Sequence, residues 1–280
     1  MRTLRLDCGQ QRRSATSGER DNTMSGAQPK PTTPDSKWEH YKLWEAVRSA
    51  IFALPSRFES DLVISGVLAP DLFAFNSSLA ATIEEQVVAA LNRVRETWDP
   101  KNAYALYQFE RQPQTFPDVI LKAQNPDLKP QILMGIELKG WYVLAKEAEP
   151  SFRYTVSPAV CADADLLAVV PWALSRVVSG SPKVFTPLVM GARHAAEMRN
   201  YYWIEERKTA GNPKIVPSAV KEHYPKKSDQ ISDEAEDDKG GNFGRVARTS
   251  IMDTYTNEIM AERLLGIVIG EWQKFLKKFK

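Results

Sequence analysis

Three charged residues stand at the ends of two short apolar segments, and their types suit metal-dependent hydrolysis. Asp118 lies near the start of the segment FPDVILKA, and Glu137 and Lys139 close the segment QILMGIELK. Side chains two positions apart on a β-strand point to the same face, so Glu137 and Lys139 project together while Leu138 turns to the opposite face. An antiparallel hairpin of the two segments would bring Asp118 to the same end. The sequence therefore predicts two carboxylates and one ammonium group at a single place.

Such a cluster has a definite use in the hydrolysis of phosphodiesters. Carboxylate oxygens bind Mg²⁺, which keeps several waters and takes a phosphate oxygen as a further ligand. The ion polarises the phosphodiester and lowers the pKa of a bound water. Lys139 would orient or help deprotonate the attacking water and offset negative charge in the transition state. We therefore expect Mg²⁺ as the cofactor, with Mn²⁺ as a substitute.

A helix ahead of the sheet can deliver a further carboxylate. Residues 78–98 have apolar side chains at helical spacing, with Pro100 beyond their end. Glu84 shares a helix face with Val88 and Leu91, which predicts that it faces inward. Glu84 is therefore the predicted third acid, and Glu85 is the alternative.

The elements that must position these residues follow from hydrophobic periodicity and turn signals. The middle of the chain predicts a meander of three strands, and the apolar run that follows predicts a strand buried on both faces. Further segments predict a second helix ahead of the sheet, another strand and two later helices. This order favours an α/β or α+β fold with a central mixed β-sheet flanked by helices. The predicted strands are 104–110, 116–123, 131–139, 165–174 and 183–192, and the predicted helices are 38–54, 78–98, 191–207 and 251–279.

Composition divides the chain into a tail and one domain. Residues 1–36 are rich in polar residues and proline, which predicts a disordered tail, and Met24 is an alternative start that the sequence leaves open. Residues 37–280 are expected to form a single nuclease domain with its catalytic core at about 78–205. The segment 226–242 is highly charged and predicts a solvated loop.

Bulk properties exclude several classes of protein. The chain has 280 residues, of which 43% are hydrophobic and 26% charged, with a net charge of +2. It has no apolar segment that reaches the roughly 18 residues needed to span a membrane. Its three histidines and two distant cysteines show no zinc-ligand spacing and predict no disulfide framework. A cytoplasmic protein without a membrane partner is expected.

Other polar and aromatic groups have a structural and a functional interpretation. The aromatic cluster Tyr201, Tyr202 and Trp203 is more often core than a platform for stacking bases. Glu149 and Arg153 are expected to form an ion pair, although either could approach a phosphate. Glu137 and Lys139 could form a solvated polar stripe, but the apolar residues around them favour core strands.

The motif FPDVIL followed by IELK resembles the PD-(D/E)XK nuclease superfamily. The longer run GIELKGWYVLAKEAEPSFRY, followed by DLLAVVPWALS, is similar to type II restriction endonucleases. The resemblance covers about residues 78–205 and implies a restriction-endonuclease-like core. It implies Glu84, Asp118 and Glu137 as metal ligands and, with Lys139, as the catalytic residues.

The same resemblance implies what the protein acts on. The expected activity is Mg²⁺-dependent endonucleolytic hydrolysis of double-stranded DNA in defence against foreign DNA. A homodimer is expected, because two-fold symmetry matches a palindromic site. A cognate DNA methyltransferase would belong to the same system without physical contact. The alternatives are a structure-directed repair or recombination nuclease of the same superfamily and a catalytically silent DNA-binding protein.

Overall fold

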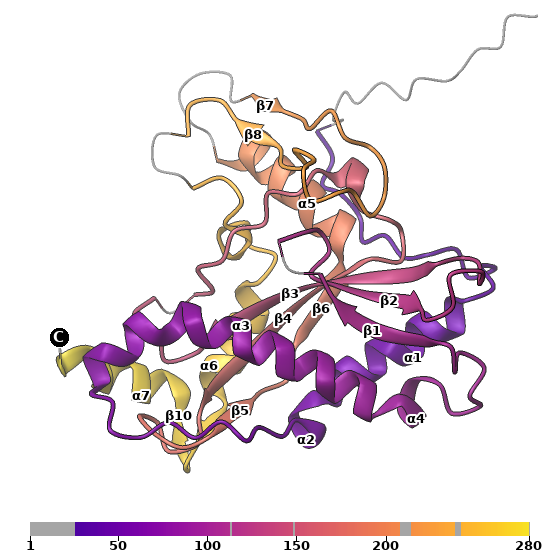
Figure 1. The fold of residues 1–280 in the computed structure, drawn as a ribbon. Helices are drawn as coiled ribbons and strands as arrows, with labels where there is room; N and C mark the ends of the chain where they lie inside the picture. Colours follow the sequence, from indigo (N-terminus) through magenta and orange to yellow (C-terminus); the bar gives the residue numbers. More distant parts are fainter. Residues whose placement is uncertain (1–25, 113, 148, 208–213, 239–241, 280) are drawn as a thin grey trace, which may run out of the picture.

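The fold is a mixed α/β arrangement built on one curled sheet (Figure 1). A computed structural model describes residues 26–112, 114–147, 149–207, 214–238 and 242–279. The described residues form a six-stranded mixed sheet in the order β1, β2, β3, β4, β5, with β6 also paired to β4. The strands are β1 (Tyr107–Arg111), β2 (Val119–Ala123), β3 (Ile132–Tyr142), β4 (Leu166–Leu174), β5 (Pro182–Val184) and β6 (Leu188–Gly191).

The predicted three-strand meander is confirmed. Strands β1 and β2 pair antiparallel, and so do β2 and β3, with Val119 opposite Ile136. Strand β3 then pairs in parallel with β4 from Ile136 to Tyr142. Strand β2 therefore stops short of the last part of β3, and residues 137–142 continue past it.

Strand β4 lies inside the sheet and is buried on both faces, as its apolar sequence predicts. Every residue from Leu166 to Leu174 is buried. The single strand predicted at 183–192 is wrong, because β5 and β6 are separate strands that pair antiparallel with successive parts of β4. The interruption lies around Pro187, which has no N–H group to donate to a ladder.

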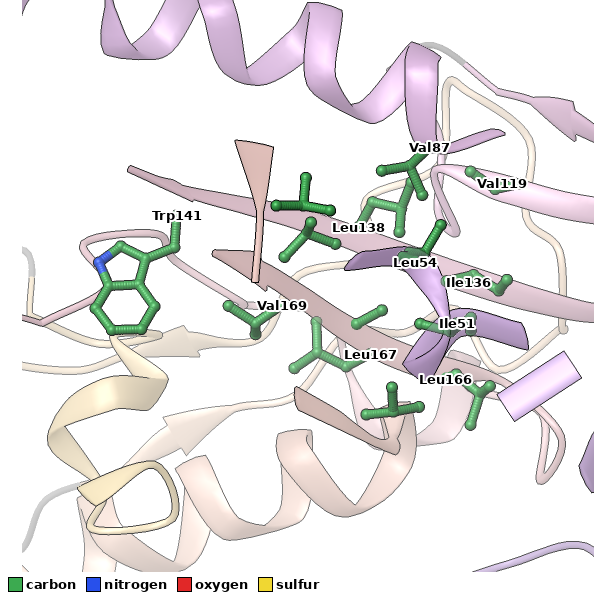
Figure 2. Packing of buried hydrophobic residues seen from close by; sticks show 14 of the residues in the cluster. Ile51, Leu54, Val87, Val119, Ile136, Leu138, Trp141, Leu166, Leu167 and Val169 are labelled. Atoms are coloured by element: carbon green, nitrogen blue, oxygen red, sulfur yellow. The ribbon is translucent and has the colours of Figure 1, made fainter. Parts of the chain in front are cut away.

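The helix predicted at 78–98 is confirmed and begins earlier than expected. Helix α3 (Ala69–Arg93) runs across the sheet, and α4 (Arg95–Trp98) follows it (Figure 1). The earlier helix is α1 (Tyr41–Phe52), followed by the short α2 (Leu54–Arg57). Val87 of α3 packs in one cluster with Ile136 and Leu138 of β3 (Figure 2). The even-numbered residues of β3 thus face the helices, as the alternation predicts.

One side-chain amide fixes the position of α3 along the sheet. Asn92 donates from Nδ2 to the carbonyl oxygen of Phe109 at 2.9 Å, and its Oδ1 accepts from the N–H of Phe109 at 2.9 Å. Both backbone groups of this residue on strand β1 are thereby satisfied. This pair of hydrogen bonds sets how far along the sheet each residue of α3 lies.

Helix α5 (Ala192–Tyr201) and the π-helical turn Tyr202–Glu206 confirm the predicted helix at 191–207. Arg199 of α5 is fully buried and donates to the carbonyl oxygens of Tyr154 and Val156 at 2.9 Å each. It also forms an ion pair with the buried Asp233 at 2.6 Å. Part of the segment 226–242 is therefore docked in the interior, and the prediction of a wholly solvated loop is wrong.

The helix predicted at 251–279 is interrupted. Helix α6 (Asp253–Ala261) ends before a two-stranded hairpin of β9 (Arg263–Leu264) and β10 (Ile267–Val268), and α7 (Ile269–Leu276) follows. Leu265 and Gly266 form the turn with φ of 53° and 82°. Positive φ at two consecutive residues cannot continue a right-handed helix, so the continuous helix is wrong. Short elements complete the described chain: β7 (Ile215–Val216), β8 (Glu234–Ala235) and 3-10 turns at Pro158–Val160, Val246–Arg248 and Lys277–Phe279.

Part of the predicted N-terminal tail packs on the fold. Residues 1–25 lie outside the described residues. In the remainder, Pro34 is buried, and Gln28 contacts the sulfur of Met198 at 3.8 Å. The carbonyl oxygen of Thr32 lies so close to Gly191 that a Cβ there would approach it to 3.0 Å. The prediction of disorder is therefore wrong for residues 26–36.

Among the described residues, no helix has both the length and the apolar character that crossing a membrane requires.

The packing of residues 26–36 predicts a difference between two truncated chains. A chain that begins at residue 37 should be less stable than one that begins at residue 26, because it loses the buried Pro34 and the contacts with α5. A loss of about 1–2 kcal/mol is expected for this amount of burial, which corresponds to a melting temperature lower by about 2–8 °C. Thermal unfolding followed by circular dichroism measures the difference. Equal melting temperatures would show that the segment adds nothing to stability.

Candidate active site

The hairpin of β2 and β3 brings the predicted residues together. Because Val119 pairs with Ile136, the residues that precede and follow them, Asp118 and Glu137, are neighbours at the end of β2. The N–H of Asp118 lies 3.2 Å from Oε2 of Glu137, and the N–H of Leu138 donates to Oδ2 of Asp118 at 3.0 Å. Each carboxylate thus accepts a backbone N–H from the partner strand. These two hydrogen bonds hold both side chains in fixed positions.

Lys139 lies between the two carboxylates. Its Nζ is 2.7 Å from Oε1 of Glu137 and 3.2 Å from Oδ2 of Asp118. The exposed fractions of the side chains are 19% for Lys139, 9% for Glu137 and 27% for Asp118. The site is therefore largely shielded from water, and it opens on the side of Asp118.

Burial gives Glu137 an unusual affinity for protons. Desolvation and the charge of Asp118 raise its pKa from an ordinary 4.5 to about 7, although Lys139 acts in the opposite direction. For Lys139, burial disfavours the charged form, but the charges of Glu137 and Asp118 outweigh this effect and raise its pKa. Lys139 is therefore charged at neutral pH, whereas Glu137 is close to its midpoint.

Helix α3 contributes Glu84, as predicted, and turns Glu85 outward. The side chain of Glu84 is 20% exposed, whereas Glu85 is an exposed residue. Desolvation and the nearby Asp118 raise the pKa of Glu84, while a backbone hydrogen bond from Gly140 and the charge of Lys139 lower it. Glu84 therefore lies within electrostatic range of the other three residues. The sequence-based choice of Glu84 over Glu85 agrees with this placement.

The donor groups suit a hard cation. Asp118 and Glu137 both contact the same ammonium nitrogen, so their oxygens lie within reach of one small ion, and Mg²⁺ prefers such carboxylate oxygens. In the described part of the chain, no three acidic, histidine or cysteine side chains stand close enough together to form a metal site by themselves. The ammonium group of Lys139 occupies the space between the two acids. Glu84 would have to move inward to become a third ligand.

Of the aromatic cluster at residues 201–203, Trp203 belongs to the core as expected, whereas Tyr201 and Tyr202 are only half-buried. Trp203 is 3% exposed and packs edge-on against Phe243, with ring centroids 5.3 Å apart. Trp141 and Tyr142 are also buried. The rings of Trp141, Tyr142 and Trp203 are therefore not available to stack on bases.

The ion pair expected between Glu149 and Arg153 is replaced by another. Glu149 pairs with Arg248 at 3.0 Å, on the segment before α6. Both side chains are 40% exposed, so the contact contributes little to stability.

Sequence reasoning missed Arg111 and Gln112. Arg111 is the last residue of β1 and lies 3.8 Å from Glu84, between Nη2 and Oε2. Gln112 follows it, and the backbone N–H of Gln112 donates to the carbonyl oxygen of Asp118 at 2.6 Å. The available signal was the alternation of buried Tyr107 and Phe109, which continues to residue 111 and places it on the face of α3.

Comparison of the chain with protein-family models, with curated proteins and with solved structures finds no match. The functional interpretation therefore depends on the geometry of the site.

The buried carboxyl of Glu137 predicts that stability depends on pH. Its pKa is about 7 in the folded protein and near 4.5 when exposed, so between these values the folded state binds more protons than the unfolded state. The free energy of unfolding of the wild type should therefore fall as pH rises from 5 to 8. Glu137→Gln removes this decline, and the two proteins should diverge by on the order of 3 kcal/mol across the range.

Urea unfolding at pH 5 and pH 8 in the presence of a chelator measures this divergence. Glu85→Gln is the matched control, because it removes a carboxylate that is already exposed. Lys139 keeps Asp118 as a partner in the Glu137→Gln variant, so it remains paired. Parallel pH profiles for wild type and Glu137→Gln would contradict the raised pKa.

Proposed function

We propose that this protein is a Mg²⁺-dependent endodeoxyribonuclease with a restriction-endonuclease-like core, of the type II restriction kind. The observation that carries the proposal is the convergence of Asp118, Glu137 and Lys139 at the end of a β-hairpin, with Glu84 supplied by the covering helix. This is the set that the resemblance to the PD-(D/E)XK superfamily implies. The mixed sheet with a long helix across it is compatible with that core.

The two hairpin carboxylates would hold the cation. A bound Mg²⁺ would polarise the phosphodiester and acidify a coordinated water. Asp118 is fixed by the N–H of Leu138, and Glu137 is fixed by the N–H of Asp118, so neither acid needs to reorganise before binding. Glu84 would complete the acidic set from the side of α3.

Lys139 serves the reaction through its position and its charge. Because its raised pKa keeps it protonated, it acts as a fixed cation and stabilises negative charge on the reacting phosphate. Binding of a cation by the two acids would draw them away from Nζ and leave the ammonium group free to contact the attacking water or the phosphate. Only 19% of its side chain is exposed, which limits how far it can move.

The substrate of this proposal is double-stranded DNA, cut within the chain. A homodimer would allow each subunit to cut one strand of a palindromic site. In a defence system, a cognate methyltransferase would protect the host's own sites. A nuclease that reads DNA structure is the second outcome that the cleavage experiment can give.

Cleavage should require a divalent cation with oxygen preference. Purified protein incubated with mixed genomic DNA should cut in Mg²⁺ or Mn²⁺ and stop cutting when EDTA is in excess, because the site offers only hard ligands. Ca²⁺ should support binding with little cutting. Gel electrophoresis gives the result: discrete bands indicate sequence-specific cutting, and a smear indicates a structure-directed or non-specific nuclease. Undiminished cutting in EDTA would exclude the proposed mechanism.

The four site residues should be separable from their neighbours by mutation. Asp118→Ala, Glu137→Ala and Lys139→Ala should each lower the cleavage rate by roughly 10²-fold or more, the scale for loss of one electrostatic or acid–base group. Glu84→Ala should lower it more than Glu85→Ala, its matched control on the same helix. Single-turnover kinetics measure the rates, and circular dichroism confirms folding. Folded Asp118→Ala and Glu137→Ala variants with wild-type rates would refute the active site.

A further inference from the structure

Arg111 lies beside the acidic site, 3.8 Å from Glu84, and has no function in the set described above. It ends β1, and its Cα partner across the ladder is Val119, the residue after Asp118. The backbone of the next residue, Gln112, is hydrogen-bonded to Asp118, and its side-chain amide donates to the carbonyl oxygen of Pro117 at 3.2 Å. The backbone that carries Arg111 is therefore hydrogen-bonded to the same corner of the sheet as the site.

The contact between Arg111 and Glu84 is a poor stabilising interaction. The distance from Nη2 to Oε2 is 3.8 Å, and the side chains are 36% and 20% exposed. A single long contact of this kind is screened by water and contributes little to folding. The buried pair of Arg199 and Asp233, at 2.6 Å and almost fully enclosed, shows how this protein builds a structural ion pair. Arg111 is not held in that way.

The two cations that the described residues place at this site are not equivalent. Lys139 is shielded and shared by two carboxylates, whereas Arg111 has a single distant partner and more than a third of its side chain in water. A polyanion that approaches three acids needs a cation that is exposed and weakly paired. A guanidinium group meets a phosphate with two parallel hydrogen bonds, which orients the phosphate as well as attracting it.

We propose that Arg111 is the phosphate-binding residue of this site and exchanges Glu84 for a phosphate of the DNA backbone. The inference rests on the proposed function for the identity of the polyanion. When a phosphate takes the guanidinium group, Glu84 loses its ion-pair partner and is free to turn toward Asp118 and Lys139. Binding of DNA thereby frees Glu84 to act as the third carboxylate, and until DNA binds Glu84 stays paired with Arg111.

The test measures binding of a duplex oligonucleotide in EDTA, where no cleavage takes place. Fluorescence anisotropy over a series of salt concentrations should show that Arg111→Ala weakens binding roughly tenfold or more, the scale of a hydrogen bond to a charged group. The slope of log K against log salt should fall by about one, as expected for one lost phosphate contact. Arg111→Lys should keep the slope and bind less tightly, because an ammonium group is not bidentate.

Arg93→Ala is the matched control. Arg93 also pairs with a glutamate, Glu59 at 2.8 Å, and its side chain is 48% exposed, but it lies at the far end of α3. Its removal should leave the affinity and the salt slope unchanged. If Arg111→Ala also leaves both unchanged, Arg111 does not bind phosphate and the proposal is overturned.

A double-mutant cycle tests the exchange itself. Glu84→Gln should tighten metal-free binding in the wild-type background, because it releases Arg111, and should tighten it less in the Arg111→Ala background. Glu85→Gln controls for the general loss of a negative charge. Equal effects of Glu84→Gln in both backgrounds would refute the exchange.

Failure of this inference is distinguishable from failure of the proposed function. A wild type that cuts DNA while Arg111→Ala binds normally overturns the role of Arg111 alone. A wild type that binds DNA through Arg111 but does not cut it in Mg²⁺ overturns the nuclease and leaves the phosphate contact standing. A wild type that binds no duplex overturns both.

Discussion

The structure depends on keeping a carboxylate, Glu137, inside a β-sheet at the edge of its hydrophobic core. A buried acid without partners would be strongly destabilising or would stay protonated. Here the ammonium group of Lys139 and the N–H of Asp118 both approach it, and its pKa still rises to about 7. These partners offset only part of the cost of burial, so the carboxyl group of Glu137 exchanges its proton near neutral pH. Such perturbed groups are characteristic of functional sites.

The surrounding fold provides the few fixed distances that this arrangement needs. The hairpin register sets Asp118 beside Glu137, and the parallel ladder with β4 anchors the other edge of β3. The amide of Asn92 fixes α3 against β1, so Glu84 lies beside the end of the β2–β3 hairpin. Packing of Val87 against Leu138 closes the apolar side (Figure 2). The charged residues of the site therefore lie on, or directly beside, regular elements that are held by these contacts.

The sequence was sufficient to predict an element where a single spacing of apolar residues extended over its whole length. The meander, the buried strand β4 and the inward face of Glu84 all follow from alternation or helical spacing in short windows. The prediction of one continuous C-terminal helix was wrong because the apolar spacing continues through the turn at Leu265 and Gly266. Only the backbone conformation of these two residues reveals the hairpin. The burial of Asp233 could not be predicted, because its partner Arg199 lies 34 positions away in the sequence and no local pattern indicates such a pairing. Arg111 was missed for a related reason, since its neighbour Glu84 belongs to a different element.

The end of β3 that extends past β2 has a consequence for how the protein behaves in a crowded solution. Beyond Ile136, β3 has no paired partner in β2, and an uncovered strand edge invites a second chain to add a strand. The N–H groups of alternate residues along such an edge point outward, and here those of Leu138 and Gly140 are taken by the carboxylates of Asp118 and Glu84. The carboxylates of Asp118 and Glu84 therefore occupy the positions at which a second chain would pair with this edge. Removing either carboxylate would leave one backbone N–H group of this edge without its acceptor.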